Sequence, residues 1–286
     1  MRRARWAWAV VICAAAAAGC LPRHAAPTGT TTARSLGPPA DGLYVQSVLL
    51  ERPVGDPLLD RGLWAAGLPA ARGATRALLT ENGLRAVVLA GNLPAGFQKA
   101  LDTESETVNP HVLTFGTRKE AVIPTAGPVD PCEYGLLTGL GGKRTEVALR
   151  QARCGVLVRP EATTDGRVRL WCEPQVQHGE RENRFRPNAD GTQFVVEGEL
   201  PLERYPALGF AVLLGPGEYL LIGWPADQPG TLGAAMFAVE AAGRPRQRVL
   251  VIRGGRPDPT PDDLPAVTTP ARRPSIAAEA SRPVGR

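Results

Sequence analysis

The sequence has few of the residues on which catalytic and metal sites are usually built. Its three histidines lie far apart, and no two of its five cysteines have a CxxC spacing. A structural zinc site needs about four such ligands at short characteristic spacings, so no metal site is predicted. In the region 43–253 the only serines are Ser47 and Ser105, and neither lies in a Gly-x-Ser-x-Gly elbow. We therefore expect no catalytic residues, no cofactor and no enzymatic activity.

Lysine and aromatic residues are also scarce. Lysine occurs only at Lys99, Lys119 and Lys143, and aromatic residues make up 5% of the chain. Binding of single-stranded nucleic acid requires a basic groove interleaved with aromatic side chains, and no such stretch is present. The formal net charge of +5 includes three arginines among the first five residues, which we expect to be removed. The composition therefore predicts no nucleic-acid partner.

One glycine-rich stretch has some likeness to a phosphate-binding loop. Residues 139–143 are Gly-Leu-Gly-Gly-Lys. A P-loop follows a strand, has Ser or Thr after its lysine and opens a helix. Here Arg144 follows the lysine, and the next segment predicts a strand. The stretch therefore predicts a flexible turn, and no small-molecule substrate is evident.

The N-terminus has the parts of an export signal. Arg2, Arg3 and Arg5 precede the apolar run 6–18, as in a secretory signal peptide. The run is shorter than the roughly 20 apolar residues that span a membrane. We therefore expect the segment to be cleaved and not retained.

Residues 17–20, Ala-Ala-Gly-Cys, place small residues directly before a cysteine. This run resembles the bacterial lipobox, with Ala17 where leucine is usual. The resemblance implies that Cys20 carries diacylglycerol on its sulfur, that residues 1–19 are removed, and that the new amino terminus is acylated, for example with palmitate. Two or three acyl chains hold a protein at a membrane stably. Leu21 in place of aspartate resembles the outer-membrane sorting signal. The alternative is an ordinary secretory signal, with Cys20 incidental.

Three cysteines remain for the folded part, Cys132, Cys154 and Cys172. In an oxidising envelope an odd number allows at most one internal disulfide. Cys154 and Cys172 lie in two predicted strands separated by a turn, which makes them the candidate pair, although any two of the three remain open. A hydrolase with Cys172 as nucleophile and His178 as base is a further alternative. Strand alternation places Cys172 on an apolar face, which predicts a buried and inert thiol.

Two terminal segments have compositions typical of disordered chains. Residues 20–42 are rich in Pro, Thr, Ala and Gly and predict a tether between the anchor and the folded part. Residues 254–286 contain repeated prolines and predict a disordered tail. The folded part should then span residues 43–253.

Residues 43–110 alternate between strand and helix signals, which predicts a small α/β module. Asp56, followed by Pro57, is expected to start the first helix. The Asn82-Gly83 pair is expected to end the second. The predicted elements are a strand at 43–50, a helix from Asp56, a helix at 70–81, a strand at 84–90 and a helix at 94–102.

From residue 111 to 253 strand signals take over. Turn residues recur at a spacing of about ten, which is typical of an antiparallel sandwich or barrel. The predicted strands are 112–115, 120–123, 145–152, 155–159, 168–173, 193–198, 209–214, 218–224, 235–240 and 247–253. The predicted fold class is therefore α+β, with a small N-terminal α/β module (43–110) followed by an antiparallel β-sandwich or barrel-like domain (111–253).

Three strand phrases follow one another in this second region. They are Val168-Arg-Leu-Trp-Cys-Glu-Pro174, Gly217-Glu-Tyr-Leu-Leu-Ile-Gly223 and Arg248-Val-Leu-Val-Ile-Arg253. Their order resembles the β-rich core of secretins, the outer-membrane ring proteins. The resemblance implies an oligomeric subunit that assembles through strand pairing.

The phrases Arg52-Pro-Val-Gly-Asp56 and Glu81-Asn-Gly-Leu84 give the chain a resemblance to lipoproteins of planctomycete-type bacteria, which implies no particular activity. These observations predict a non-enzymatic, lipid-anchored protein of the cell envelope, expected at the outer membrane, with a structural or partner-binding role. The expected partners are the membrane, through Cys20, and another envelope protein. The alternative is a secretin-like or secretin-associated oligomeric assembly subunit.

Overall fold

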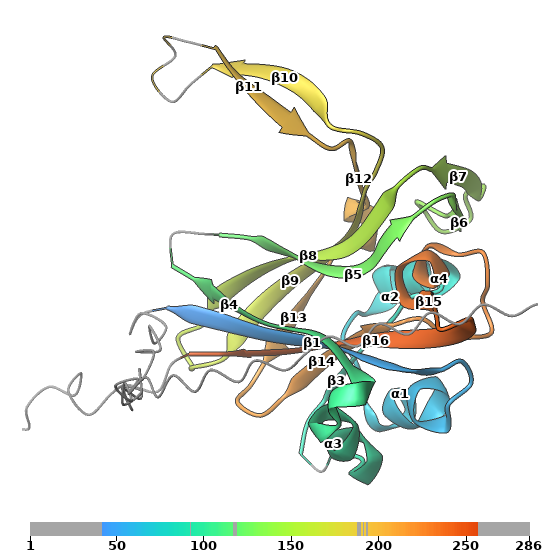
Figure 1. Cartoon of the computed structure of the whole chain (residues 1–286). Helices are drawn as coiled ribbons and strands as arrows, with labels where there is room; N and C mark the ends of the chain where they lie inside the picture. Colours follow the sequence, from blue (N-terminus) through green and yellow to red (C-terminus); the bar gives the residue numbers. More distant parts are fainter. Residues whose placement is uncertain are drawn as a thin grey trace, which may run out of the picture. The chain divides into compact units, whose positions relative to one another are not determined.

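Two antiparallel β-sheets pack face to face in the described part of the chain (Figure 1). The computed structural model describes residues 42–91, 93–116, 119–187, 190, 192 and 194–256. They belong to the second of two compact units into which the chain divides, residues 36–286. The predicted signal peptide, Cys20, residues 20–41 of the predicted tether and residues 257–286 of the predicted tail lie outside the described residues.

The larger sheet, here called sheet A, has seven strands and is antiparallel throughout. Its order is β2-β3-β14-β16-β1-β4, and β15 pairs with β16 beside this path. The strands are β1 (Leu43–Pro53), β2 (Leu68–Pro69), β3 (Arg85–Leu89), β4 (Thr107–Phe115), β14 (Tyr219–Gly223), β15 (Ala238–Ala241) and β16 (Arg244–Gly255). Sheet A therefore joins the beginning of the described chain to its end.

The second sheet, here called sheet B, has five antiparallel strands in the order β12-β9-β8-β5, with β13 also paired to β9. Its strands are β5 (Ala121–Val129), β8 (Ala152–Ala162), β9 (Val168–Gln177), β12 (Leu202–Arg204) and β13 (Phe210–Leu214). Two hairpins complete the β-structure: β6 (Cys132–Leu136) with β7 (Thr145–Leu149), and β10 (Glu182–Pro187) with β11 (Phe194–Glu199).

Alternating apolar side chains build the main core between the two sheets. Val45 and Leu49 of β1, and Leu170 and Cys172 of β9, belong to one buried cluster, and each is at most 1% exposed. The spacing of four residues in β1 and two in β9 follows from the pleat, which turns successive side chains to opposite faces. Burial of each such side chain stabilises the fold by roughly 1.5–3 kcal/mol relative to exposure.

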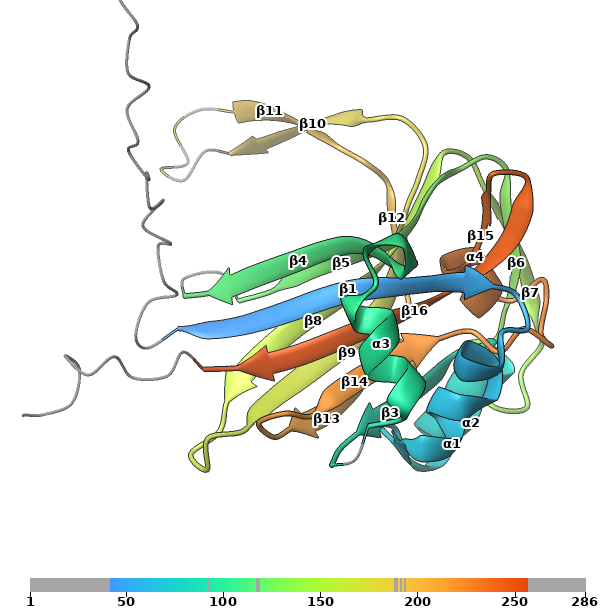
Figure 2. The ribbon, with the colours of Figure 1, turned by 60° about the horizontal axis from the view of Figure 1, so that its bottom comes forward.

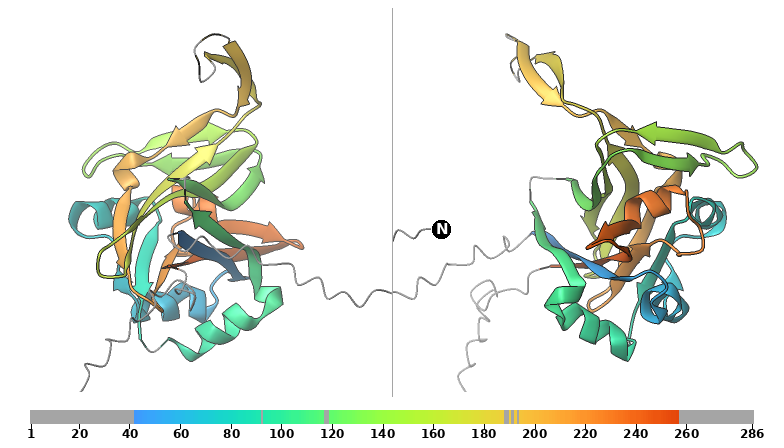
Figure 3. Two further views of the ribbon diagram at one scale, coloured as in Figure 1. Left: turned by 90° about the vertical axis from the view of Figure 1, so that its left-hand side faces the viewer. Right: turned by 45° about the vertical axis from the view of Figure 1, so that its right-hand side comes forward.

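Helices cover the other face of sheet A and form a second, smaller core (Figure 2). Leu63 and Phe97 are fully buried there together with Val249 of β16. These two residues lie in α1 (Leu63–Ala66), which continues the π-helical turn η1 (Leu58–Gly62), and in α3 (Ala95–Asp102). The remaining helical elements are α2 (Gly73–Glu81), α4 (Leu232–Phe237) and the 3-10 turns η2 (Glu104–Glu106) and η3 (Pro206–Leu208). Helix α4 contacts β5, β6 and β8, and Figure 3 shows it beside these strands.

The predicted α+β fold class is wrong. The described residues are mostly β, and the strands expected to build an N-terminal α/β module, β1 and β3, are antiparallel members of sheet A. Their neighbours β16 and β14 come from the end of the described chain. The reason is that an alternating apolar pattern specifies the two faces of a strand but not which strand lies beside it. Of the intervening helices, α1 and α3 pack on the outer face of sheet A, whereas α2 adds Leu78 and Leu79 to the main core. None of them connects parallel strands.

Individual elements agree better with the prediction. Strands at the ranges predicted from 43–50 to 247–253 are found, with one clear exception at 235–240. There the first half is the end of α4, whose N-cap Thr231 accepts a hydrogen bond on its Oγ1 from the Ala234 amide at 3.3 Å. Strand β15 begins only at Ala238. Strands β2, β6, β10 and β12 were not predicted.

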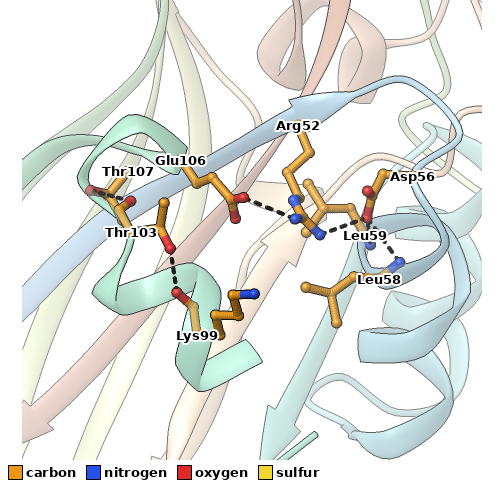
Figure 4. Close-up of polar contacts among 8 residues, drawn as sticks. All are labelled: Arg52, Asp56, Leu58, Leu59, Lys99, Thr103, Glu106 and Thr107. Atoms are coloured by element: carbon orange, nitrogen blue, oxygen red, sulfur yellow. Dashed lines mark hydrogen bonds and ion pairs between the residues drawn. The ribbon is translucent and has the colours of Figure 1, made fainter. Parts of the chain in front are cut away.

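The predicted helix start at Asp56 is confirmed (Figure 4). Its Oδ1 accepts hydrogen bonds from the amides of Leu58 (2.9 Å) and Leu59 (3.4 Å). Arg52 lies between two carboxylates, with Nη1 3.3 Å from Asp56 Oδ1 and Nη2 2.9 Å from Glu106 Oε1. Both carboxylates favour the charged guanidinium and raise the pKa of Arg52 against the opposing effect of burial. The contacts join the end of β1 to η1 and to η2.

Candidate partner-binding groove

A groove of about 300 Å³ lies on the outer face of sheet A, where the covering helices end. Its lining is mainly apolar. Val48, Tyr219 and Val251 come from central strands of sheet A, Leu101 comes from the last turn of α3, and Pro110 and Val112 come from β4. The helical layer therefore leaves part of the apolar face of the sheet open to a partner.

Strand β4 forms one side of this groove and is an edge of sheet A. Among the described residues it pairs only with β1. Val112 in this strand is 66% exposed, although it is a large apolar residue. The pairing is irregular next to it, with a register shift between Ser47 and Leu49 of β1, and Asn109 has a φ of 53°. An open strand edge carries unpaired N–H and C=O groups that another strand can bind.

Polar groups also line the groove. Gln46, His111 and Arg253 are polar residues of the lining. Ser47 alternates with Val45 and Leu49, so its side chain, which is 4% exposed, faces the core between the sheets. The Ser47 Oγ is buried and has no hydrogen-bond partner among the described residues. The polar groups that a chain bound in the groove can reach are therefore those of Gln46, His111 and Arg253.

The structure also places the residues considered for catalysis. Cys172 lies in the core between the sheets, in register with Val158 on β8 and Phe210 on β13, and it is fully buried. Burial raises the pKa of its thiol far above the usual range, which keeps it protonated. The His178 Nε2 lies 3.6 Å from Glu203 Oε1, beyond the end of β9. His178 therefore faces a carboxylate of β12, the strand that follows the β10–β11 hairpin.

The predicted pair Cys154 and Cys172 occupies neighbouring strands but different register positions. Cys154 is opposite Val176, and Cys172 is opposite Val158, four residues further along β8. Four residues of strand span about 13 Å, whereas the Cα atoms of a disulfide lie within about 7 Å. The register therefore does not bring this pair together. All three described cysteines are buried free thiols.

The glycine-rich stretch 139–143 lies in the turn between β6 and β7, as predicted. The Gly142 amide donates to the Gly139 carbonyl at 3.1 Å, which closes the turn. Among the residues that the structure describes, no group of three or more His, Cys, Asp and Glu side chains is arranged to hold a metal ion. No described helix is long and apolar enough to cross a membrane.

Comparison with known proteins finds a weak likeness in three solved structures. The titles of all three name a secretin. The InvG secretin-domain β-barrel of the Salmonella injectisome matches at a TM-score of 0.21 with 11% identity, over 78% of this chain and 64% of that one. The ETEC pilotin–secretin complex AspS–GspD matches at 0.22 with 10% identity, over 75% and 49%. The V. cholerae competence pilus secretin PilQ matches at 0.18 with 15% identity, over 74% and 56%.

This chain thus spans about half to two thirds of the length of the secretin chains that it matches. No protein-family model matches the sequence, and no curated protein matches it. The resemblance to lipoproteins of planctomycete-type bacteria stays a prediction, as does acylation at Cys20.

Proposed function

We propose that the protein is a lipid-anchored protein of the cell envelope that binds an extended segment of another envelope protein along β4. The anchor is Cys20, at the end of the export segment with its Ala-Ala-Gly-Cys sequence. The role is one of binding and not of catalysis. The observation that carries the proposal is the open edge of sheet A next to an apolar groove.

The geometry suits strand addition. A strand that pairs with the free edge of β4 gains main-chain hydrogen bonds, and its alternate side chains point to one face of the sheet. On the outer face these side chains meet the groove lined by Val48, Leu101 and Val251. The same pairing would cover Val112. Strand addition therefore accounts for a large apolar residue that is exposed on an open edge.

The second candidate function is a secretin-like or secretin-associated assembly subunit. Sheet A ends in β4 on one side and in the short strand β2 on the other, and both are edges among the described residues. Two different edges on one sheet permit head-to-tail pairing of copies, which closes into a ring if the rotation allows it. In this case the segment that binds along β4 belongs to a second copy of the chain.

Photo-crosslinking of the full chain in living cells tests both candidates. A benzoyl-phenylalanine replaces Val112, and in a matched control it replaces Leu68, which is 70% exposed on the opposite edge strand β2. An adduct with one envelope protein, formed from position 112 and absent from position 68, supports the binding role. An adduct between two copies supports the assembly subunit. Self-adducts from both positions fit head-to-tail pairing of β4 with β2, whereas the same foreign protein captured from both positions, or no adduct from 112, contradicts strand addition at β4.

The anchor is tested in the same cells. Cys20→Ala removes the acylated sulfur, so the chain should move from the membrane fraction to the soluble fraction and the adduct from position 112 should become several-fold weaker. Retention of the Cys20→Ala chain at the membrane would show that the anchor is not Cys20.

A further inference from the structure

A second groove, larger than the one beside β4, lies between an edge strand of sheet B and an edge strand of sheet A. It has a volume of about 750 Å³. Strand β13 forms one wall, and among the described residues this strand pairs only with β9. The other wall is the stretch of chain from β2 to the first turn of α2. The groove therefore runs along the open side of β13.

Both walls leave groups that another chain can cover. Leu68 of β2 is 70% exposed. The open edge of β13 presents main-chain N–H and C=O groups, and no described strand lies beside them. At the start of β13 the Trp171 ring packs so closely on Gly209 that a Cβ at this glycine would clash with it. The groove therefore combines an unpaired strand edge with apolar side chains.

The described residues that line the groove carry more positive than negative charge. Arg72 and Arg167 are its cations, and Glu218 is its acid. Arg167 donates from Nε to Asp165 Oδ2 at 2.8 Å, and Glu218 accepts from the Gly215 amide at 2.7 Å. Arg72 is exposed and forms no ion pair with a described residue. An acidic segment in the groove would therefore meet one cation that has no other partner.

The described chain ends beside this groove. Its last residue, Arg256, donates from Nη2 to the Thr163 carbonyl at 3.0 Å. Thr163 lies in the turn between β8 and β9, and both its amide and its hydroxyl donate to the carbonyl of Arg167, which lines the groove. Gly254 of β16 lies against Val168, which pairs with the last residue of β13. The C-terminal tail, residues 257–286, therefore starts at the end of the groove where β13 finishes.

The start of the tail has the charge and the pattern of an edge strand for this groove. Residues 257–264 are Pro-Asp-Pro-Thr-Pro-Asp-Asp-Leu, with three aspartates and no basic residue. Successive residues of an extended chain direct their N–H groups to opposite edges. The prolines at 257, 259 and 261 therefore fall on one edge, and the amides of the residues between them fall on the other. Such a chain can donate to a neighbouring strand from one side only, as an edge strand does.

We propose that residues 257–264 bind in this groove of their own chain, as an edge strand of sheet B that pairs with β13. The tail starts where β13 ends and runs back along it, so the pairing is antiparallel. The five residues of β13 span about 17 Å, whereas eight extended residues reach about 26 Å, so the segment is long enough. Its aspartates then lie near Arg72 and Arg167.

The bound segment closes the open side of the molecule between β13 and β2. Its outer edge consists of prolines and offers no N–H group there to a further strand, which protects sheet B from pairing with other chains. The inference is independent of the proposed function, because β4 does not line this groove.

Photo-crosslinking within the purified full chain tests the inference. Benzoyl-phenylalanine replaces Leu68, and the irradiated protein is digested with trypsin. Position 68 then lies on peptide 62–72, and the segment lies on peptide 254–272, because trypsin does not cleave between Arg256 and Pro257. We expect these two peptides to be linked. Absence of this link would overturn the inference.

Isotope labelling distinguishes the occupants of the groove. Chains with ordinary and with heavy nitrogen are mixed before irradiation, and a link within one chain joins two peptides of the same label. Links that join the two labels would show that the tail comes from a second copy, which overturns binding within the chain. Capture of another protein from position 68 in cells, in place of this link, would overturn it as well.

Neutralising the aspartates tests recognition by charge. Asp262→Asn combined with Asp263→Asn should lower the yield of the link several-fold, and so should a high salt concentration, which screens the arginines. Glu279→Gln is the matched control, since it removes an acid of the tail outside the segment, and the yield should stay the same. Equal yields from the two variants would contradict recognition by Arg72 and Arg167. The adduct from position 112 should be the same in both, so the two proposals can fail separately.

Discussion

Buried polar side chains join segments that are far apart in the chain. Glu173 is 2% exposed, and both its oxygens accept hydrogen bonds from Arg204, at 2.9 and 3.1 Å. Asn82 is fully buried, and its side chain both accepts from the Leu137 amide and donates to the Leu137 carbonyl, each at 2.8 Å. The sequence predicts that Asn82 ends α2, which is confirmed. Its second role, holding the chain after β6, depends on a residue 55 positions away.

The hydrogen-bonded pair Tyr134 and Tyr205 should make the stability of the fold depend on pH in the alkaline range. Burial raises the pKa of Tyr205 to about 12, whereas an unfolded tyrosine ionises near 10. Between these values the unfolded state loses this proton while the folded state keeps it, so the free energy of unfolding should fall as pH rises from about 10 to about 12.

Tyr205→Phe removes the ionisable group and should make this decline shallower. Urea unfolding followed by circular dichroism at several pH values between 9 and 12 measures the slope for both chains. Comparison with the variant is needed because other basic groups also titrate in this range. Equal slopes for the two chains would show that Tyr205 does not contribute.

At the scale of elements, short local signals place helix ends and turns correctly. Asp56 caps η1 because a carboxylate just before a helix accepts from the free amides of its first turn. The glycines at 139–143 are likewise a local signal, and they predict the turn found there. These signals act over a few residues, so they do not depend on the tertiary contacts of the rest of the chain. The segment 235–240 shows the limit of such signals. A strand was predicted there, but its apolar run fits a helix equally well, and the Thr231 cap starts α4 instead.

Asp56→Ala should destabilise the protein by about 1–2 kcal/mol, since it removes the cap and one partner of Arg52. Asp56→Asn should recover most of the loss, because asparagine also caps helices. Asp60→Ala is the matched control: it removes a nearby carboxylate whose recorded contact is an ion pair of 3.5 Å with the exposed Arg61. Its effect should stay within about 0.5 kcal/mol. Urea unfolding measures all three, and equal losses for Asp56→Ala and Asp60→Ala would contradict the capping role.

At the scale of the whole molecule, sheet A pairs strands from the two ends of the described chain, so each set needs the other in order to be buried. The strand β1 lies between β4 and β16, and β3 lies between β2 and β14. Leu250 and Ile252 of β16 share a buried cluster with Val45 and Leu49 of β1. Strands 43–53 and 85–89 therefore bury their apolar faces only when the C-terminal strands are present.

Residues 43–110 expressed alone should consequently be unfolded. Without β14 and β16 the strands β1 and β3 lack their neighbours, and isolated strand pairs are at best marginally stable in water. Circular dichroism should show little regular structure and no cooperative thermal transition, while the full chain shows one. A cooperative transition in the fragment would mean that the segment folds by itself and that its pairing with β16 is not required.

The sequence alone determined the local features of this protein: the strand ranges, the cap at Asp56, the end of α2 at Asn82, the turn at 139–143 and the apolar face that buries Cys172. Only the tertiary structure decided which strands are neighbours and that Val112 lies exposed on an edge beside a groove. The physical reason is the distance along the sequence over which each kind of interaction acts. Caps, turns and alternation act between residues a few positions apart, whereas strand order and register follow from burying apolar faces that the chain brings together from its two ends.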